Sequence, residues 1–143
     1  MYILDTDHLS ILEGGGTKAQ HLLIRLANVK ANNVAATIIS YEEQLRGWLS
    51  YIRKAKTIDG EVEAYKQLKK QLNNYCNIPI IEFDEQAAQQ FKRLKNDYPR
   101  LGTMDLKIAA ICLINKAVLL TRNQKDFGNI SGLNTEDWTS PTG

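Results

Sequence analysis

The chain has 143 residues and a formal net charge of +2, and 43% of its residues are hydrophobic, which fits one globular domain with a substantial core. Two cysteines without CxxC spacing exclude a disulfide framework, and we expect Cys76 and Cys112 to be small buried side chains of apolar helices. No stretch approaches the roughly 20 apolar residues that span a bilayer, and the N-terminus lacks the features of a signal peptide, so we expect a cytoplasmic protein with no membrane partner.

Strand and helix patterns alternate along the first half of the chain. Residues 2–6 are an apolar segment that predicts a strand, and residues 17–30 predict an amphipathic helix. The β-branched segment 34–39 predicts the second strand. Two helices follow, one capped by Ser40 and one over residues 59–77, where apolar residues recur every three or four positions.

The same alternation continues through the second half. Residues 78–83 predict the third strand, with a helix after it. The segment 104–115 is apolar almost all round and predicts a central helix. We expect the last two strands over residues 117–121 and 130–133, and a frayed tail over residues 137–143.

Strands that alternate with helices predict an α/β fold, in which a parallel sheet carries helices on both faces. Because crossovers between parallel strands are right-handed, the carboxyl ends of the strands lie at one edge of the sheet. Ligands of open α/β sheets bind at that edge. We therefore expect a single domain over residues 1–143, with its core over about residues 2–134.

Four acidic residues fall where their side chains could face this edge. Asp5 ends the first strand, Glu43 lies in the first turn of the helix after the second, Asp105 lies in the first turn of the apolar helix 104–115, and Asp126 follows the fourth strand. Each one alone is an ordinary turn residue or first-turn helix residue. Together at one edge, the carboxylates repel one another unless a cation lies among them, and oxygen ligands suit Mg²⁺ or Mn²⁺. Such an ion activates water and binds the phosphodiester in metal-dependent nucleases. The two histidines, His8 and His21, offer no zinc site, and we expect His8 at the surface.

The acids lie in four short segments, which are LDTDHLS at 4–10, SYEEQLRG at 40–47, GTMDLKIAA at 102–110 and TRNQKDF at 121–127. Taken in this order, the segments resemble those of PIN-domain ribonucleases, especially the VapC-type toxins of toxin–antitoxin systems. Two positions depart from the commonest pattern of that family. Asp7 stands where asparagine is frequent, and Gln44 separates Glu43 from Leu45.

The resemblance implies a PIN-like three-layer sandwich, with a five-stranded parallel sheet in the order 3-2-1-4-5 between layers of helices. It also implies an Mg²⁺- or Mn²⁺-dependent endoribonuclease that forms homodimers and is inhibited by a cognate antitoxin protein. The catalytic and metal-binding acids that it implies are Asp5, Glu43, Asp105 and Asp126, the last being more variable. The residues that it places around these acids are Asp7, Thr103, Thr121 and Asn123, with the two threonines orienting carboxylates.

RNA is polyanionic, so basic side chains near the acids are candidates for phosphate contacts. These candidates are Arg46, Lys107, Arg122 and Lys125. We expect Trp48 to pack against the protein rather than to stack on a base. The apolar side chains of the helices after the first two strands are candidates for an antitoxin groove, because such grooves bind amphipathic helices.

Two functions of other classes stay open. Residues 4–7 also resemble the DxD opening of haloacid-dehalogenase phosphatases, in which Asp5 would be the nucleophile and Asp7 the general acid. Leu9 and the absence of a late acidic pair depart from that family. The other alternative is a non-catalytic PIN-like module that binds RNA or a protein partner.

Overall fold

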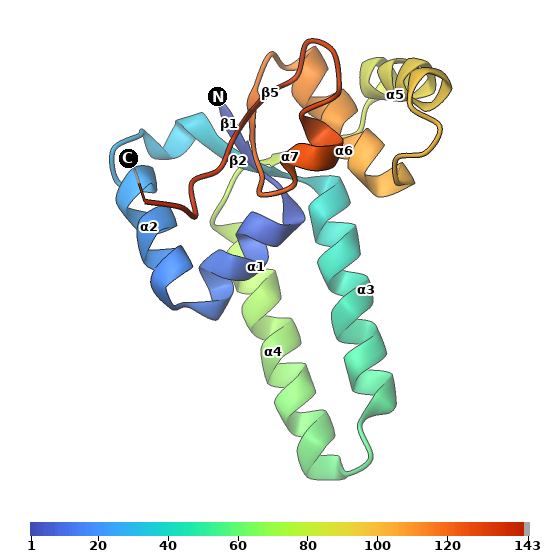
Figure 1. The fold of residues 1–143 in the computed structure, drawn as a ribbon. Coiled ribbons are helices and arrows are strands. Elements are labelled where there is room, and N and C mark those ends of the chain that lie inside the picture. Colours follow the sequence, from blue (N-terminus) through green and yellow to red (C-terminus); the bar gives the residue numbers. More distant parts are fainter. Residues whose placement is uncertain (142–143) are drawn as a thin grey trace.

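The computed structural model describes residues 1–141 and contains a five-stranded parallel sheet (Figure 1). The strands are β1 (Tyr2–Leu4), β2 (Val34–Thr37), β3 (Ile80–Ile81), β4 (Val118–Leu120) and β5 (Asn134–Glu136). Their order is β3-β2-β1-β4-β5, and each neighbouring pair is parallel. The predicted order 3-2-1-4-5 is confirmed, and β1 lies at the centre of the sheet.

Helices cover the sheet and extend beyond it. They are α1 (Thr6–Gly14), α2 (Thr17–Leu26), α3 (Ile38–Lys54), α4 (Ile58–Cys76), α5 (Glu85–Asp97), α6 (Thr103–Ile114) and the short α7 (Gln124–Phe127), with a 3₁₀ turn at Ala31–Asn33. α3 and α4 lie side by side and project from the sheet as a long hairpin (Figure 1). No helix within residues 1–141 is both long enough and apolar enough to cross a membrane.

Alternating side chains of the central strands explain why both faces of the sheet carry helices, because successive strand residues point to opposite faces. In β1, Ile3 belongs to the core cluster that includes α5 and α6, whereas Leu4 belongs to the cluster that includes α1, α2 and α4. Leu119 and Leu120 of β4 divide between the two clusters in the same way. All four side chains are fully buried, as expected in a parallel sheet covered on both sides.

The first two strands end earlier than predicted, because the residues after them begin helices. Asp5 is the N-cap of α1, a helix that our prediction omits because its first turn is polar and its apolar periodicity is short. Thr37 is the N-cap of α3, so Ser40 lies inside that helix rather than at its cap.

The bounds of three other elements also differ from the prediction. α2 ends at Leu26 instead of residue 30. Just beyond this end, the Asn28 side chain donates a hydrogen bond to a carbonyl of the last turn of α2. β3 is shortened to two residues that directly follow Pro79, which has no N–H for pairing. β5 lies at Asn134–Glu136 rather than at residues 130–133, whose apolar side chains pack on the core from a turn that contains Gly132 at φ 82°.

The predicted frayed tail is wrong for residues 137–139, which pack on the protein. Trp138 is only 3% exposed, and its ring lies 4.7 Å from that of Tyr2. Residues 142 and 143 lie outside the described part of the chain. Of the two cysteines, Cys112 is buried as expected, whereas Cys76 is exposed because it lies on the outer side of the last turn of α4.

Candidate metal centre

A cleft of about 320 Å³ opens at the carboxyl edge of the sheet. It is lined by residues of α1, α3, α6 and the segment after β4, which are Asp5, Thr6, Asp7, Ser10, Glu43, Asp105, Ile108, Asn123 and Phe127. Three of the four predicted acids therefore share this cleft. They come from elements that are distant in sequence and that the parallel sheet brings together.

Asp5 is fixed by the backbone on both sides. Its own N–H donates to the Leu120 carbonyl at 3.0 Å, which attaches it to the end of β4. Its Oδ1 accepts the backbone N–H of His8 at 2.7 Å, which caps α1. The residue is 5% exposed. Since Oδ1 is directed at the helix, Oδ2 is the oxygen left for a ligand in the cleft.

Glu43 lies in the second turn of α3 and is oriented by a hydroxyl from α1. The Thr6 Oγ1 lies 2.7 Å from Glu43 Oε1 and 2.9 Å from the Ser40 hydroxyl. Because a carboxylate only accepts, Thr6 donates its proton to Glu43. Thr6 and Ser40 were not among the predicted site residues, although both belong to the motif segments.

Asp105 shows most directly that the acids act on one another. It lies in the first turn of α6, and its pKa is raised to about 6, chiefly by burial and then by the charges of Glu43, Asp126 and Asp5. Each of these neighbours disfavours the ionised form of Asp105. A divalent cation among them would relieve this repulsion.

Asp126 lies behind the cleft rather than in its wall. Its Oδ2 accepts a hydrogen bond from Asn123 Nδ2 at 3.1 Å, and its backbone N–H donates to Asn123 Oδ1 at 3.3 Å. Asn123 itself lines the cleft and caps α7. The Asp126 charge therefore reaches Asp105 through space, while the side chain orients Asn123.

Asp7 forms a bidentate ion pair at the mouth of the cleft. Its two oxygens accept hydrogen bonds from Arg122 Nε at 2.6 Å and from Arg122 Nη2 at 3.1 Å. This pairing raises the pKa of Arg122. The pair places a guanidinium directly beside the acidic cleft, and both side chains are partly exposed.

The two predicted orienting threonines have other contacts. Thr121 is fully buried, and its Oγ1 accepts the backbone N–H of Asn123 at 2.9 Å. Thr103 is exposed and accepts a hydrogen bond from Lys95 at 3.4 Å. Within residues 1–141 neither hydroxyl donates to a carboxylate, so Thr121 supports the site by shaping the loop that carries Asn123.

The predicted basic residues differ in their availability. Lys107 lies over the rings of Phe83 and Phe91, at 5.6 and 5.7 Å from their centroids, which directs its charge toward α5. Arg46 is paired with Glu42 one turn earlier on α3. Lys125 is exposed on α7, so together with Arg122 it leaves a basic edge beside the cleft.

His8 is fully buried, which contradicts its expected place at the surface. Its Nε2 accepts the backbone N–H of Trp138 at 3.3 Å, so in the neutral ring Nδ1 carries the proton. Nδ1 lies 3.3 Å from Asp5 Oδ1 without hydrogen-bond geometry.

A group of possible metal-ligand atoms lies close together around Asp5. Possible ligand atoms of Asp5, Asp7 and His8 lie within 4.8 Å of one another, but a protonated His8 Nδ1 has no lone pair to offer a metal. The usable donors are therefore carboxylate oxygens, which suit a hard cation. Glu43 and Asp105 line the same cleft as Asp5, and Mg²⁺ usually keeps several water ligands beside one or two carboxylates.

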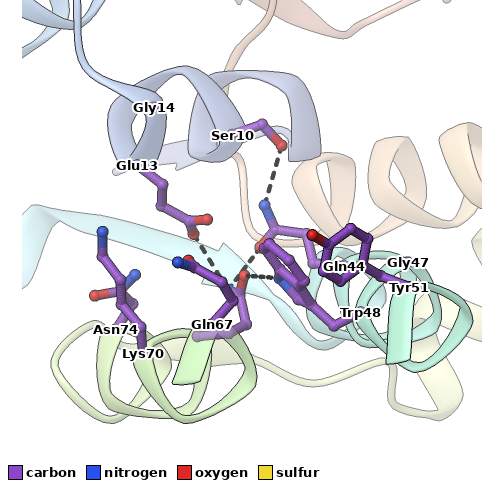
Figure 2. Close-up of a pocket in the computed structure, with 11 residues that line it drawn as sticks. Ser10, Glu13, Gly14, Gln44, Gly47, Trp48, Tyr51, Gln67, Lys70 and Asn74 are labelled. Carbon is purple, nitrogen blue, oxygen red and sulfur yellow. Dashed lines mark hydrogen bonds between the residues drawn. The ribbon is translucent and has the colours of Figure 1, made fainter. Parts of the chain in front are cut away.

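A second cavity of about 480 Å³ lies between α1, α3 and α4 and shares Ser10 with the cleft. Figure 2 shows Ser10 of α1 facing Gln44 of α3 across this opening, whereas Glu13 of α1 points toward α4. Gln44 donates to Ser10 at 3.1 Å, and the buried Gln71 of α4 donates to both Gln44 and Glu13, at 2.9 and 3.2 Å.

The same hydrogen-bond network accounts for the contacts of Trp48 and Gln44 in α3. Trp48 donates its indole N–H to Gln71 at 3.0 Å, so it packs between the helices as predicted. Gln44, which departs from the commonest family pattern, also accepts the Tyr75 hydroxyl at 2.7 Å. The residue after Glu43 is thus the link that joins α1, α3 and α4.

Comparison with known proteins agrees with this arrangement. The PIN domain family profile matches residues 2–133. Ribonuclease VapC1 of Haemophilus influenzae strain R2866 is 25% identical over 144 residues, which cover 97% of this chain and 98% of the relative. The VapBC-1 structure from nontypeable Haemophilus influenzae is 24% identical, covers 97% of this chain and 98% of its own, and has a TM-score of 0.70. DNA-bound VapBC from Salmonella typhimurium is 20% identical, with coverages of 96% and 97% and a TM-score of 0.75. The chain therefore belongs to the PIN domain family.

Proposed function

We propose that this PIN-domain protein is a metal-dependent endoribonuclease and the toxin of a toxin–antitoxin pair. The observation that carries the proposal is the convergence of Asp5, Glu43, Asp105 and Asp126 on one edge of the sheet, where burial and then the charges of the other three acids raise the pKa of Asp105 to about 6. A cation bound among the carboxylates would offset this repulsion. The full-length relation to Ribonuclease VapC1 supports RNA as the substrate.

The cofactor that we propose is Mg²⁺ or Mn²⁺, since carboxylate donors favour both. When bound, the ion supplies an activated water and neutralises charge on the phosphodiester. Asp5 and Asp105 would bind it most directly, with Glu43 and Asp126 completing the site or positioning the attacking water. We expect hydrolysis to leave a 5′-phosphate and a 3′-hydroxyl.

The chain's own residues would prepare the site before RNA arrives. Thr6 fixes one oxygen of Glu43, and Asn123 is held in the cleft wall by Asp126. Arg122 is paired with Asp7 of the cleft lining, and Lys125 is exposed on α7. Both would contact the phosphate backbone of bound RNA, and such cations bind RNA without reading its sequence.

The phosphatase alternative needs Asp7 to act as a general acid, which fits the structure poorly. Both Asp7 oxygens accept hydrogen bonds from Arg122. Neither oxygen is therefore free to face the leaving group of a phosphate ester bound at Asp5. The non-catalytic alternative is separated from the proposal by the cleavage experiment below.

Asp5→Asn is the test of the proposed activity. Asparagine caps helices as well as aspartate does, so α1 should persist and the melting temperature should change little. Loss of the carboxylate should reduce metal-dependent cleavage of a structured RNA by more than the roughly 10–100-fold cost of losing an outer-shell partner. Cleavage is measured with Mg²⁺ or Mn²⁺, and with EDTA as the metal-free comparison.

Asp84→Asn is the matched control. Asp84 caps α5 in the same way, by accepting the backbone N–H of Ala87 at 2.9 Å, but it does not line the cleft. This variant should cleave RNA at the wild-type rate. Full activity of Asp5→Asn, or equal losses in both variants, would reject the assignment of Asp5 as a metal ligand.

The antitoxin is the second proposed partner, since the solved relatives include VapBC complexes. A groove of about 670 Å³ between α1, α2 and α4 has an apolar wall formed by Leu9, Leu12, Leu26, Val29 and Ile78. Lys70 and Asn74 line both this groove and the cavity in Figure 2. We propose that an amphipathic antitoxin helix covers this surface. A homodimer remains part of the proposal and is tested by the mass of the free protein in solution.

A further inference from the structure

His8 lies in a buried position between the metal centre and the C-terminal segment. It is 0% exposed and lies one turn after Asp5 in α1. On its other side are residues 137–139, of which Trp138 and Thr139 are each only 3% exposed. His8 is thus the side chain that connects the proposed ligand Asp5 with a segment 130 residues later in the chain.

The C-terminal segment determines which ring nitrogen of His8 carries the proton. The Trp138 N–H can only donate, so Nε2 must accept, and Nδ1 keeps the hydrogen. Asp137 Oδ1 lies 3.8 Å from Nε2, but it is already engaged by the Thr139 N–H at 2.9 Å and by the Thr139 hydroxyl at 2.6 Å. The segment is therefore fixed independently of His8.

The protonated Nδ1 faces Asp5. It lies 3.3 Å from Oδ1, and among residues 1–141 it is the buried side-chain polar atom without a hydrogen-bond partner. A buried, unpaired N–H is costly unless it serves another purpose. Here the Nδ1–H dipole adds to the His8 backbone N–H on the same carboxylate oxygen, Oδ1, so that Oδ2 is the oxygen left for a ligand.

We propose that His8 is a positioning residue for the metal centre: the C-terminal segment fixes its tautomer, and its Nδ1–H orients and stabilises the Asp5 carboxylate for binding the cation. This inference rests on the proposed function, because it assumes that Asp5 is a ligand. Outer-shell partners of this kind typically change metal affinity by about 10–100-fold. The inference thus predicts that metal affinity depends on His8 beyond its contribution to folding.

Two substitutions separate the contacts of the two ring nitrogens. In His8→Asn the amide nitrogen can replace Nδ1 and donate toward Asp5, whereas the contact with Trp138 is lost. In His8→Gln the amide oxygen can replace Nε2 and accept from Trp138, whereas the donor toward Asp5 is lost. We expect Mn²⁺ affinity, measured by titration calorimetry without RNA, to fall about 10-fold or more in His8→Gln and to change little in His8→Asn.

The melting temperature measured without metal should show the reverse order, with His8→Asn the less stable variant. His21→Gln is the matched control, because His21 Nδ1 contacts the carbonyl of Thr139 at 3.0 Å and so touches the same segment without touching Asp5. Its Mn²⁺ affinity should equal that of the wild type. Equal Mn²⁺ affinity of His8→Gln and the wild type would overturn the inference, as would equal losses in both His8 variants.

The wild-type protein provides a test that needs no folded variant. Nitrogen-15 NMR of the labelled histidines should show a protonated Nδ1 and an unprotonated Nε2 for His8, and the opposite tautomer would overturn the inference. The outcome is distinct from failure of the proposed function. If neither the wild type nor any variant cleaves RNA with Mg²⁺ or Mn²⁺, the proposed function is wrong, and normal cleavage by Asp5→Asn rejects Asp5 as a ligand. A normal His8→Gln affinity with inactive Asp5→Asn rejects only the role of His8.

Discussion

Asp105 is the residue whose ionisation links the metal centre to stability. Its pKa in the folded chain is raised from 3.8 to about 6, so the folded state binds this proton more tightly than the unfolded state does. The stabilisation from protonated Asp105 is therefore complete below pH 3.8 and is lost as the pH rises through about 6. Above that range the ionised carboxylate opposes folding unless a cation is bound.

Asp105→Asn should remove this dependence. The difference in melting temperature between the wild type and the variant, measured without metal from pH 4 to pH 7, should shift in favour of the variant as the pH rises. Mg²⁺ added at pH 7 should stabilise the wild type more than the variant, since binding to the folded state alone raises stability. A difference that stays constant with pH would contradict the shared acidic site.

Arg122 permits a test of RNA binding at the scale of one side chain. Arg122→Gln should weaken RNA binding and reduce the slope of affinity against salt by about one phosphate contact. Binding is measured by fluorescence anisotropy with inactive Asp5→Asn as the background. Arg93→Gln, at an exposed position on α5, is the control that should keep the wild-type salt slope. If the slope of RNA affinity against salt stayed unchanged in Arg122→Gln, Arg122 would pair with Asp7 without contacting a phosphate of the RNA.

At the scale of elements, the hairpin of α3 and α4 depends on polar contacts as well as on apolar packing. Gln71 is 2% exposed and bonds to Trp48, Gln44 and Glu13 at once. Gln71→Ala should lower the free energy of unfolding by about 2 kcal/mol, because buried partners lose their hydrogen bonds. Urea denaturation measures the change.

Gln67→Ala is the control for this prediction. Gln67 lies one turn earlier on α4, and its amide bonds only to the exposed Glu63, at 3.1 Å. Its loss should cost no more than about 0.5 kcal/mol. If the two variants were equally stable, the network around Gln71 would contribute nothing beyond surface contacts.

The elements also show what the sequence could and could not reveal. Apolar runs and β-branched residues were sufficient to predict the first four strands and the larger helices, and the resemblance supplied the strand order. The fifth strand was placed at residues 130–133 instead of Asn134–Glu136. The strand ends were less accurate, because Asp5 and Thr37 are polar caps that look like strand ends. The burial of His8 could not be predicted, since it depends on Trp138, which lies 130 residues away.

Contacts between residues far apart in sequence also explain which parts of the candidate metal centre were not predicted. The acids were predicted because each belongs to a short local segment, and the structure brings three of them into one cleft. The contact of Thr6 with Glu43 joins residues 37 positions apart, so nothing local indicates it. Lys107 looked like an RNA contact from its place beside Asp105, but a helix turn directs it to two phenylalanine rings.

At the scale of the whole molecule, the antitoxin surface and the metal centre should be separable. Lys70→Glu changes the charge at a position shared by the two openings beside α1 and α4, and it should weaken the complex with the antitoxin without changing RNA cleavage by the free protein. Lys92→Glu on α5 should affect neither. Co-purification and cleavage assays measure the two effects, and reduced cleavage in Lys70→Glu would show that the surfaces overlap.

The pairing of His8 with the C-terminal segment has a consequence for the growing chain on the ribosome. Asp105 and Asp126 are synthesised about a hundred residues after Asp5, and Trp138 comes later still. Because the proposed metal centre draws on all these regions, a nascent chain that lacks the later ones could not assemble it. The proposed nuclease would thus stay inactive during its own translation, close to the messenger RNA and ribosome that produce it.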